Sequence, residues 1–289
     1  MTRINREPLT QNKTFIGQNK PQCFVSNISI GSAVMCTAQS PDKTTGNEDS
    51  AALIPVNSES AVFVIADGAG GMRGGKQASA IAIETLIKVV SESVKSNTDI
   101  RNAILNGIEQ ANAAIINLGI GAGSTISVVE QNGMTIRIYH VGDSEVIVMG
   151  QRGRLIHQTI PHSPIGYAVE AGLIEPEEAL HHEERHIVSN ILGSNVMHIA
   201  IGPEIKLAKY DTVLLSSDGL TDNLSIDTIV NSVRKGRLSA AVRKLFKTTL
   251  KQMESPEATD ACKPDDLTII GFRQYPIGHP SKVTNSIAK

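Results

Sequence analysis

The apolar positions of the chain fall into short continuous runs that predict buried strands. The clearest run, Ala-Val-Phe-Val-Ile-Ala at residues 61–66, leads directly into Asp67-Gly68. A second run at residues 212–216 leads toward another Asp-Gly pair that begins at Asp218. Such runs, bounded by turn residues, are typical of strands with both faces covered. The same reasoning predicts strands over residues 28–37, 51–56, 125–130, 135–141, 146–149 and 267–272.

Apolar residues that recur every three or four positions predict amphipathic helices. These helices come in two sequential pairs, over residues 77–95 and 99–118 and over residues 226–235 and 239–253. Between two strand runs, Asn132-Gly133 is a strong hairpin signal. Residues 162–199 are less regular, with a short acidic helix predicted around residues 176–182. Hairpins combined with consecutive helices indicate an α+β fold with antiparallel sheets in a single domain.

The composition is that of an ordinary globular protein. The 289 residues are 40% hydrophobic and carry a net charge of −2, so we expect no nucleic-acid partner and no anionic-membrane surface. No apolar stretch approaches the roughly 18–20 residues of a membrane span. The three cysteines are odd in number and lack Cys-x-x-Cys spacing, which predicts neither a disulfide framework nor a thiolate zinc site and favours a reducing cytoplasm. They are Cys23, Cys36 and Cys262.

The two ends of the chain differ from its middle in composition. Residues 1–22 are polar, rich in amides and Lys, and lack the hydrophobic core of a signal peptide, so we expect a flexible tail. Residues 275–289 carry Pro, Gly and Ser and are expected to be loose as well. One globular domain over residues 23–274 remains.

Five short acidic segments each place a carboxylate at a sharp turn or at a strand end. Asp-Gly alone is a common turn dipeptide, and the other segments could be caps or solvated turns. Repetition of one arrangement favours a shared site, because strand ends are where a rigid scaffold presents functional groups. Carboxylates gathered there repel one another unless cations neutralise them. Mg²⁺ and Mn²⁺ prefer such oxygen ligands, and pairs of these ions serve phosphoryl chemistry. The segments are Asn47-Glu48-Asp49-Ser50, Asp67-Gly68-Ala69-Gly70-Gly71, Gly142-Asp143-Ser144, Ser217-Asp218-Gly219 and Asp265-Asp266.

Other candidate sites are weaker. The glycine-rich segment at residues 68–75 lacks the Lys-Ser/Thr of a phosphate-binding P-loop, which disfavours nucleotide binding. Ser124 and Ser163 lack a His and Asp pattern that would indicate a nucleophilic triad. A histidine group lies among glutamates and is better explained by a solvated acidic helix than by a metal site. Its members are His181, His182 and His186.

The order and spacing of the acidic segments resemble the metal-dependent Ser/Thr protein phosphatases, the PPM or type 2C family, in their compact bacterial form. The resemblance spans residues 28–273. It implies a four-layer α-β-β-α sandwich in which two antiparallel sheets are flanked by helix pairs. It also implies two or three Mn²⁺ or Mg²⁺ ions, hydrolysis of phosphoserine and phosphothreonine in proteins, an opposing Ser/Thr kinase and a monomeric enzyme. The matching motifs are Asn47-Glu48-Asp49, Val64-Ile65-Ala66-Asp67-Gly68, His140-Val141-Gly142-Asp143-Ser144, Leu214-Leu215-Ser216-Ser217-Asp218-Gly219 and Asp265-Asp266-Leu267-Thr268.

The resemblance also implies roles for individual residues. Asp67 would bridge two metal ions in a site between the sheets. Asp218 and Asp265 would hold one ion, and Glu48 with the Gly68 carbonyl would hold the other. A metal-bound water would be the nucleophile, so no protein nucleophile is needed.

Further roles are implied around this centre. Asp143 would help Asp218 to hold a third, weaker ion. Asp49 and Asp266 would act on the ions through neighbouring groups or water. Residues 164–194 would form a flap beside the substrate groove.

The chain departs from the family pattern at positions near the phosphate. Thr44 stands where the family usually has an Arg that contacts phosphate, and the adjacent Lys43 could substitute for it. Ala69 replaces a His found in some members, Pro161 an Asp, and Glu145 an Arg. These departures leave a second hypothesis open, a weakly active or inactive phosphatase-fold module that binds a partner. The complete carboxylate set favours the enzyme.

Overall fold

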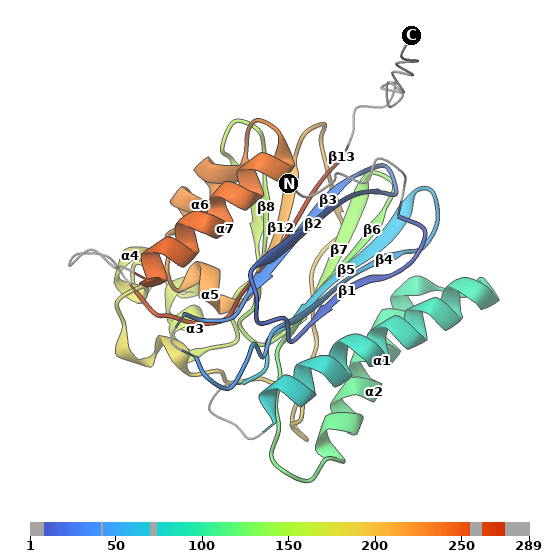
Figure 1. Cartoon of the computed structure of the whole chain (residues 1–289), viewed down its shortest axis with the longest axis horizontal. Helices are drawn as coiled ribbons and strands as arrows, with labels where there is room; N and C mark the ends of the chain where they lie inside the picture. The colour runs from blue at the N-terminus through green and yellow to red at the C-terminus, as the bar shows by residue number, and fades with distance from the viewer. Residues whose placement is uncertain (1–8, 42, 70–73, 255–261, 275–289) are drawn as a thin grey trace.

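The computed structural model describes residues 9–41, 43–69, 74–254 and 262–274, whose elements form four layers (Figure 1). Two antiparallel sheets stack face to face in the middle. Helices α1 (Gly75–Ser96) and α2 (Ile100–Ile116) cover the outer face of one sheet, and α6 (Ile226–Val233) and α7 (Leu238–Glu254) cover the outer face of the other. The predicted α+β sandwich is therefore confirmed.

The first sheet is built around β5, which delivers Asp67. Its hairpin β6–β7 turns at Asn132-Gly133, as predicted, and Gly133 adopts the left-handed φ of +54° that this turn requires. The strands, in spatial order, are β1 (Lys13–Ile16), β4 (Ser50–Pro55), β5 (Ser60–Ala66), β6 (Ile126–Asn132), β7 (Thr135–Val141) and β10 (Ala200–Ile201), with β11 (Ile205–Lys206) also pairing with β7.

The second sheet is built around the neighbours β12 and β13, and two more of the acidic segments lie beside the ends of these strands. Thr212–Ser216 has the predicted bounds, and β13 runs two residues longer than predicted. The strands, in spatial order, are β2 (Gln22–Ile28), β3 (Gly31–Ala38), β13 (Leu267–Gln274), β12 (Thr212–Ser216), β8 (Glu145–Met149) and β9 (Leu155–Gln158).

The long helices agree with the predicted pairs to within about two residues at most ends. Two of them have side-chain caps at their starts: the Asp99 side chain accepts from Arg101 N at 3.1 Å, and Ser225 Oγ accepts from Thr228 N at 3.3 Å. The long helices are α1 (Gly75–Ser96), α2 (Ile100–Ile116), α6 (Ile226–Val233) and α7 (Leu238–Glu254). The short ones are α3 (Pro164–Glu170), α4 (Pro176–Ala179), α5 (Asp218–Thr221) and the 3₁₀ turn η1 (Glu183–His186).

The apolar run of β5 has no polar alternation because both of its faces are covered. Val62 and Val64 point to the core under α1 and α2, whereas Phe63 and Ile65 point between the sheets. There the Phe63 ring lies 4.9 Å from the Phe272 ring of β13, centroid to centroid. Packing across both faces fixes the strand, and so it fixes the turn that carries Asp67.

The predicted N-terminal tail is wrong for part of its length. Lys13–Ile16 form β1, an edge strand that pairs with β4, and Leu9 N donates to Asn27 O at 2.7 Å. An edge strand of four residues is too short to show the apolar pattern of a buried strand, and its partner β4 lies about 40 residues further along the chain. Residues 1–8 and the predicted tail at 275–289 lie outside the described residues.

The predicted strand over residues 28–37 is also corrected, because it spans the end of one strand and the start of another. Ser29, with φ of +46°, forms the turn between β2 and β3. Within the irregular region, the predicted helix over 176–182 shrinks to α4, and α3 and η1 were missed because helices of one or two turns leave too little periodicity.

The expectation of no disulfide is wrong. Cys23 and Cys36 face each other across the β2–β3 pair and are bonded, with their Cα atoms 4.1 Å apart. An odd number of cysteines does not reveal that two of them meet in a hairpin. The cytoplasmic assignment drawn from the cysteines loses that support. Across the described ranges, no helix is long and apolar enough to cross a bilayer.

Candidate functional site

Asp67 is fixed at the end of β5 by its own backbone. Its N–H donates to Thr125 Oγ1 at 3.0 Å, and its carbonyl accepts from Thr125 N and from Ser124 Oγ, both at 2.8 Å. Burial raises the pKa of Asp67, and nearby negative charges raise it further. The carboxylates responsible are Asp49, Asp218, Asp265 and Asp143. The structure therefore brings together the carboxylates of separate segments, as the sequence predicted.

Gly68 lets this turn pack directly against the start of α1. A Cβ at Gly68 would lie 2.3 Å from the backbone C and O atoms of Gly75. Gly68 N donates to Glu48 O at 3.2 Å, and Ala69 N donates to Gly123 O at 3.0 Å. Only glycine fits here, so the turn, the Glu48 segment and α1 form one packed unit.

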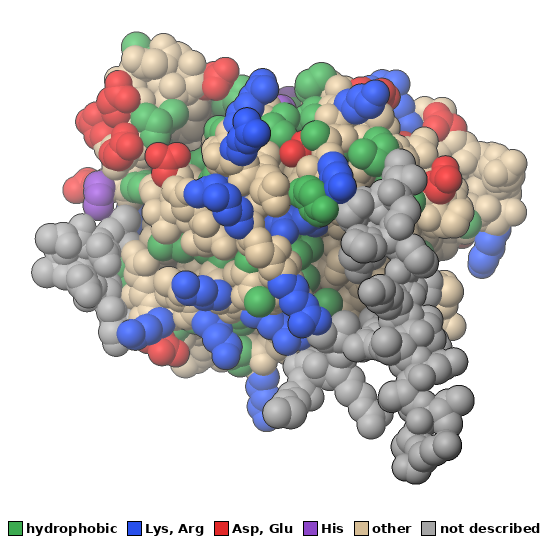
Figure 2. Space-filling model, turned by 90° about the horizontal axis from the view of Figure 1, so that it is seen from above, with side chains coloured by type: hydrophobic (Ala, Val, Ile, Leu, Met, Phe, Trp, Pro, Cys, Tyr) green, Lys and Arg blue, Asp and Glu red, His purple; other side chains and the backbone are tan. Residues whose placement is uncertain are grey.

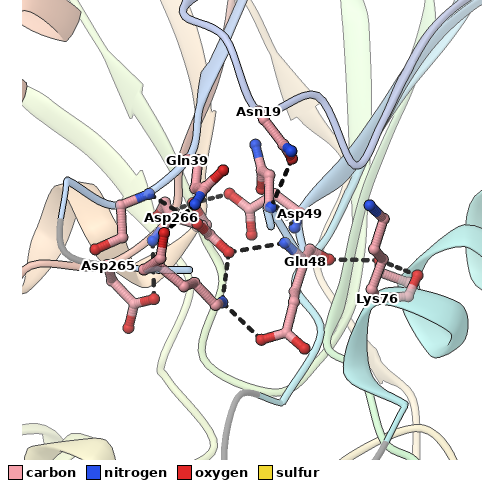
Figure 3. Close-up of polar contacts among 12 residues, drawn as sticks. Asn19, Gln39, Glu48, Asp49, Lys76, Asp265 and Asp266 are labelled. Carbon is pink, nitrogen blue, oxygen red and sulfur yellow. Dashed lines mark hydrogen bonds and ion pairs between the residues drawn. The ribbon is translucent and has the colours of Figure 1, made fainter. Parts of the chain in front are cut away.

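Lys43 lies between two acidic segments. Its Nζ is 2.6 Å from Glu48 Oε2 and 2.6 Å from Asp266 Oδ2, and Figure 3 shows the Glu48 and Asp266 side chains meeting across these contacts. Asp266 also accepts from Ser40 N at 2.8 Å and from Glu48 N at 2.7 Å. Asp266 thus ties the Glu48 loop to the end of β3. Thr44 is exposed.

A second ammonium group lies on the other side of the cluster. Lys263 Nζ is 2.7 Å from Asp218 Oδ2 and 2.6 Å from Asp222 Oδ2, and it lies 3.6 Å from Asp265 Oδ2. Sequence reasoning missed Lys263 and Asp222. The available signals were the position of Lys263 two residues before Asp265 and that of Asp222 four residues, about one helical turn, after Asp218.

Two buried carboxylate oxygens have no hydrogen-bond donor among the described residues. They are Asp49 Oδ1 and Asp218 Oδ1, although the second oxygen of Asp49 accepts from Ser217 Oγ at 2.8 Å. Burial raises the pKa of Asp49 to about 8, with the Asp266 charge acting in the same direction. A buried carboxylate oxygen without a donor is costly unless a cation binds it.

The donor chemistry fits Mg²⁺ or Mn²⁺, because the clustered acceptors are carboxylate oxygens. Within the described ranges, however, no three His, Cys, Asp or Glu side chains are arranged so that they could hold a metal ion. Lys43 and Lys263 lie between the carboxylates and form ion pairs with them. The orphaned oxygens of Asp49 and Asp218 are the positions still open to a cation.

A cavity of about 500 Å³ opens beside the acidic cluster. Asp143 and Asp218 of the cluster line it, and Ile165 and Val169 of α3 contribute apolar lining. The elements of the predicted flap, α3, α4 and η1, border this cavity. The labelled helices α3 and α4 lie toward the left of the molecule in Figure 1, and Figure 2 shows acidic side chains gathered at its left edge. The cluster is thus reached through a groove with an apolar wall and an acidic rim.

Glu145 occupies the base of this groove. It is buried, accepts from Gln158 Nε2 at 2.7 Å, and has its pKa raised to about 7 by burial. A carboxylate here, in place of a cationic side chain, makes the groove more acidic near Asp143.

The histidines play structural parts. His162 stacks on His140 with centroids 4.3 Å apart, its Nδ1 accepts from Gly142 N at 3.1 Å, and burial lowers its pKa to about 4. His182 Nδ1 accepts from Glu184 N at 3.1 Å and so caps η1, while the neighbouring His181 is exposed.

Comparison with known proteins gives one consistent family. The profile of the family Protein phosphatase 2C matches residues 42–263. Protein phosphatase PhpP of Streptococcus pneumoniae (strain D39) is 30% identical over 193 residues, covering 63% of this chain and 76% of PhpP. The serine/threonine phosphatase stp of Listeria welshimeri is 27% identical over 201 residues, covering 67% of this chain and 79% of its own.

Solved structures agree with the sequence matches. The PPM Ser-Thr phosphatase MsPP from Mycobacterium smegmatis, in complex with cacodylate, superposes with a TM-score of 0.70 at 26% identity and covers 85% of this chain and 99% of its own. The S. agalactiae serine/threonine phosphatase gives 0.69 at 26% identity, covering 84% and 98%. PstP in complex with two manganese ions, at 21% identity and a TM-score of 0.67, covers 84% and 98% and shares the fold.

Proposed function

Because the chain belongs to the protein phosphatase 2C family, we propose that it hydrolyses phosphoserine and phosphothreonine in proteins with the help of divalent metal ions. The observation that carries the proposal is the convergence of carboxylates from separate segments around Asp67, with orphaned buried oxygens on Asp49 and Asp218. Several mutually repelling carboxylates kept in one place have a chemical use when cations bind them.

Asp67, Asp218 and Asp265 are proposed to bind one metal ion, and Asp67, Glu48 and the Gly68 carbonyl a second. When bound, Mn²⁺ or Mg²⁺ would acidify a water molecule and neutralise the charge of the phosphoryl group.

The protein contributes to the reaction by holding the metal-binding groups in fixed positions. Hydrogen bonds from Thr125 and Ser124 fix the backbone of Asp67. The contacts of Asp266 with Ser40 N and Glu48 N fix the Glu48 loop against β3. No side chain has to supply a nucleophile, which agrees with the lack of a Ser or Cys triad pattern.

The substrate would approach through the groove beside α3. A phosphorylated segment of a protein, modified by an opposing Ser/Thr kinase, could lie along the apolar wall formed by Ile165 and Val169 and reach the cluster at Asp143. Lys43 is less suited to the phosphate-binding role expected of it, because its ammonium is already bound by Glu48 and Asp266.

The test is phosphate release from a phosphothreonine peptide with Mn²⁺, with and without EDTA. We expect metal-dependent release that Asp67→Asn reduces to the level seen in EDTA, with an unchanged circular dichroism spectrum. Glu109→Gln, an exposed position on α2, is the matched control and should retain full activity. Full activity of Asp67→Asn would refute the proposed site. Metal binding without turnover on any phosphopeptide would favour the binding-module hypothesis, with Thr44→Arg as the next variant.

A further inference from the structure

We propose that the Lys263 ammonium is a built-in cation of the acidic cluster and takes the place of a third metal ion beside Asp143 and Asp218. The inference rests on the proposed two-metal function and concerns how many ions this chain needs. Lys263 contacts three carboxylates, from α5, from the residue after α5 and from the segment before β13.

The backbone of Lys263 is held in a built position. Lys263 N donates to Asn223 Oδ1 at 2.9 Å, and Asn223 Nδ2 donates to Lys263 O at 2.8 Å. Asn223 is 2% exposed, and its Nδ2 also lies 3.0 Å from Gly219 O. This clamp joins Lys263 to the short helix that carries Asp218, so the ammonium and its carboxylates belong to one rigid unit.

The Lys263 ammonium makes the kind of carboxylate contacts that a bound metal cation would make. A lysine ammonium has three N–H donors, and here two carboxylate oxygens lie within 2.7 Å and a third at 3.6 Å. The side chain is 24% exposed, so water screens these attractions only in part. Arg185 Nε lies 3.8 Å from the same Oδ2 atom of Asp222 that Lys263 contacts, so this oxygen has two cationic neighbours.

Asp218 can serve the ammonium and a metal ion at the same time. Its Oδ2 contacts Lys263, whereas its Oδ1 is buried and has no donor among the described residues. Asp265 differs, because its Oδ1 accepts from Asp266 N at 2.8 Å and its Oδ2 lies 3.6 Å from Lys263 Nζ. An ion between Asp67 and Asp218 therefore need not displace Lys263.

Asp143 is within reach of the same positive charge. Burial raises the pKa of Asp143, as do the charges of Asp218 and Asp222, and the Lys263 charge acts in the opposite direction. The ammonium thus already offsets part of the negative charge that a third metal ion would neutralise at this position.

The experiment counts bound Mn²⁺ ions in the absence of substrate, by electron paramagnetic resonance of free Mn²⁺ and by calorimetry. We expect wild type to bind two ions and Lys263→Met to bind one more, while Lys263→Arg keeps the wild-type number. In EDTA, Lys263→Met should melt several degrees lower than wild type and recover with Mn²⁺. Lys247→Met, an exposed lysine on α7, is the control and should change neither result.

A second variant keeps the proposal testable should Lys263→Met fail to fold. Asp143→Asn in the wild-type background should leave the Mn²⁺ count unchanged, because no third ion depends on it. Loss of one ion in Asp143→Asn, or an identical ion count and EDTA melting temperature in wild type and Lys263→Met, would overturn the proposal. Absence of any Mn²⁺ binding by wild type would instead count against the proposed function, and the melting comparison in EDTA would still decide the role of Lys263.

Discussion

The Cys23–Cys36 disulfide is the feature whose removal has the most calculable effect on stability. It joins adjacent strands β2 and β3 near the edge of the second sheet. Cys36 is fully buried in the core under α6 and α7, whereas Cys23 is only partly buried. Cys23→Ala therefore removes the bond with the smaller loss of packing.

The expected magnitude follows from the length of the closed loop. The two cysteines are 13 residues apart in sequence, and closing a loop of that size in the unfolded chain is worth about 3 kcal/mol in the chain-entropy description. For a domain of roughly this size, about 3 kcal/mol corresponds to a melting temperature lower by about 6–12 °C. Reduction of wild type should produce a shift of the same size.

Thiol titration and thermal unfolding together form the assay. The sequence contains three cysteines, so denatured, unreduced wild type should show one reactive thiol, that of Cys262, and three after reduction. Cys23→Ala should melt at the temperature of reduced wild type and gain nothing from oxidation. Cys262→Ala, which lies outside the disulfide, is the control and should remain sensitive to reductant.

Activity below the melting temperature should survive the loss of the bond. Thr37, next to Cys36, holds the site through Thr268 Oγ1 at 2.8 Å and Asn47 Nδ2 at 3.1 Å. Its strand stays paired along β13 without the disulfide. Three thiols in unreduced wild type, or equal melting temperatures with and without reductant, would refute this reasoning.

Two further predictions concern the site itself. Gly68→Ala should abolish Mn²⁺-dependent phosphate release and lower the melting temperature, because the added Cβ would lie 2.3 Å from the Gly75 backbone. The control is Gly150→Ala, where the atom nearest to the added Cβ would be 3.6 Å away, and it should change neither quantity. In EDTA, the free energy of unfolding should fall as pH rises from about 4 to about 8, because burial raises the pKa of Asp265 to about 7 and of Asp49 to about 8 from 3.8. The native state then holds protons that the unfolded chain has released, so stability decreases with pH over that interval. Urea unfolding at several pH values across this range would measure the decrease in the free energy of unfolding. Adding Mn²⁺ near neutral pH should restore the lost stability. A free energy of unfolding that rises from pH 4 to 8 in EDTA would contradict the prediction.

The parts of the fold that were predictable are those whose signal is local. The run at Thr212–Ser216 is buried on both faces and bounded by turns, so its pattern alone gives both ends of β12. β1 and the first residues of β2 lie at sheet edges with half-buried side chains, and they are strands only because β4 and β3 pair with them. The disulfide depends on the same hairpin pairing, which a count of cysteines cannot supply.

In the site, too, the acidic residues could be predicted from the sequence, but the positive charges that neutralise them could not. Each predicted carboxylate could be located because it follows a strand or a turn, and strand ends meet in space. The cations that neutralise them could not be assigned, since an acidic cluster is satisfied equally by a metal ion or by an ammonium that reaches it. Lys43 and Lys263 are near the acidic segments in sequence, but the sequence does not specify which carboxylates their side chains reach. Neither lysine contacts the buried oxygens Asp49 Oδ1 and Asp218 Oδ1, which have no donor among the described residues. These two oxygens therefore indicate where a metal ion is still required, whereas the number of acidic residues does not.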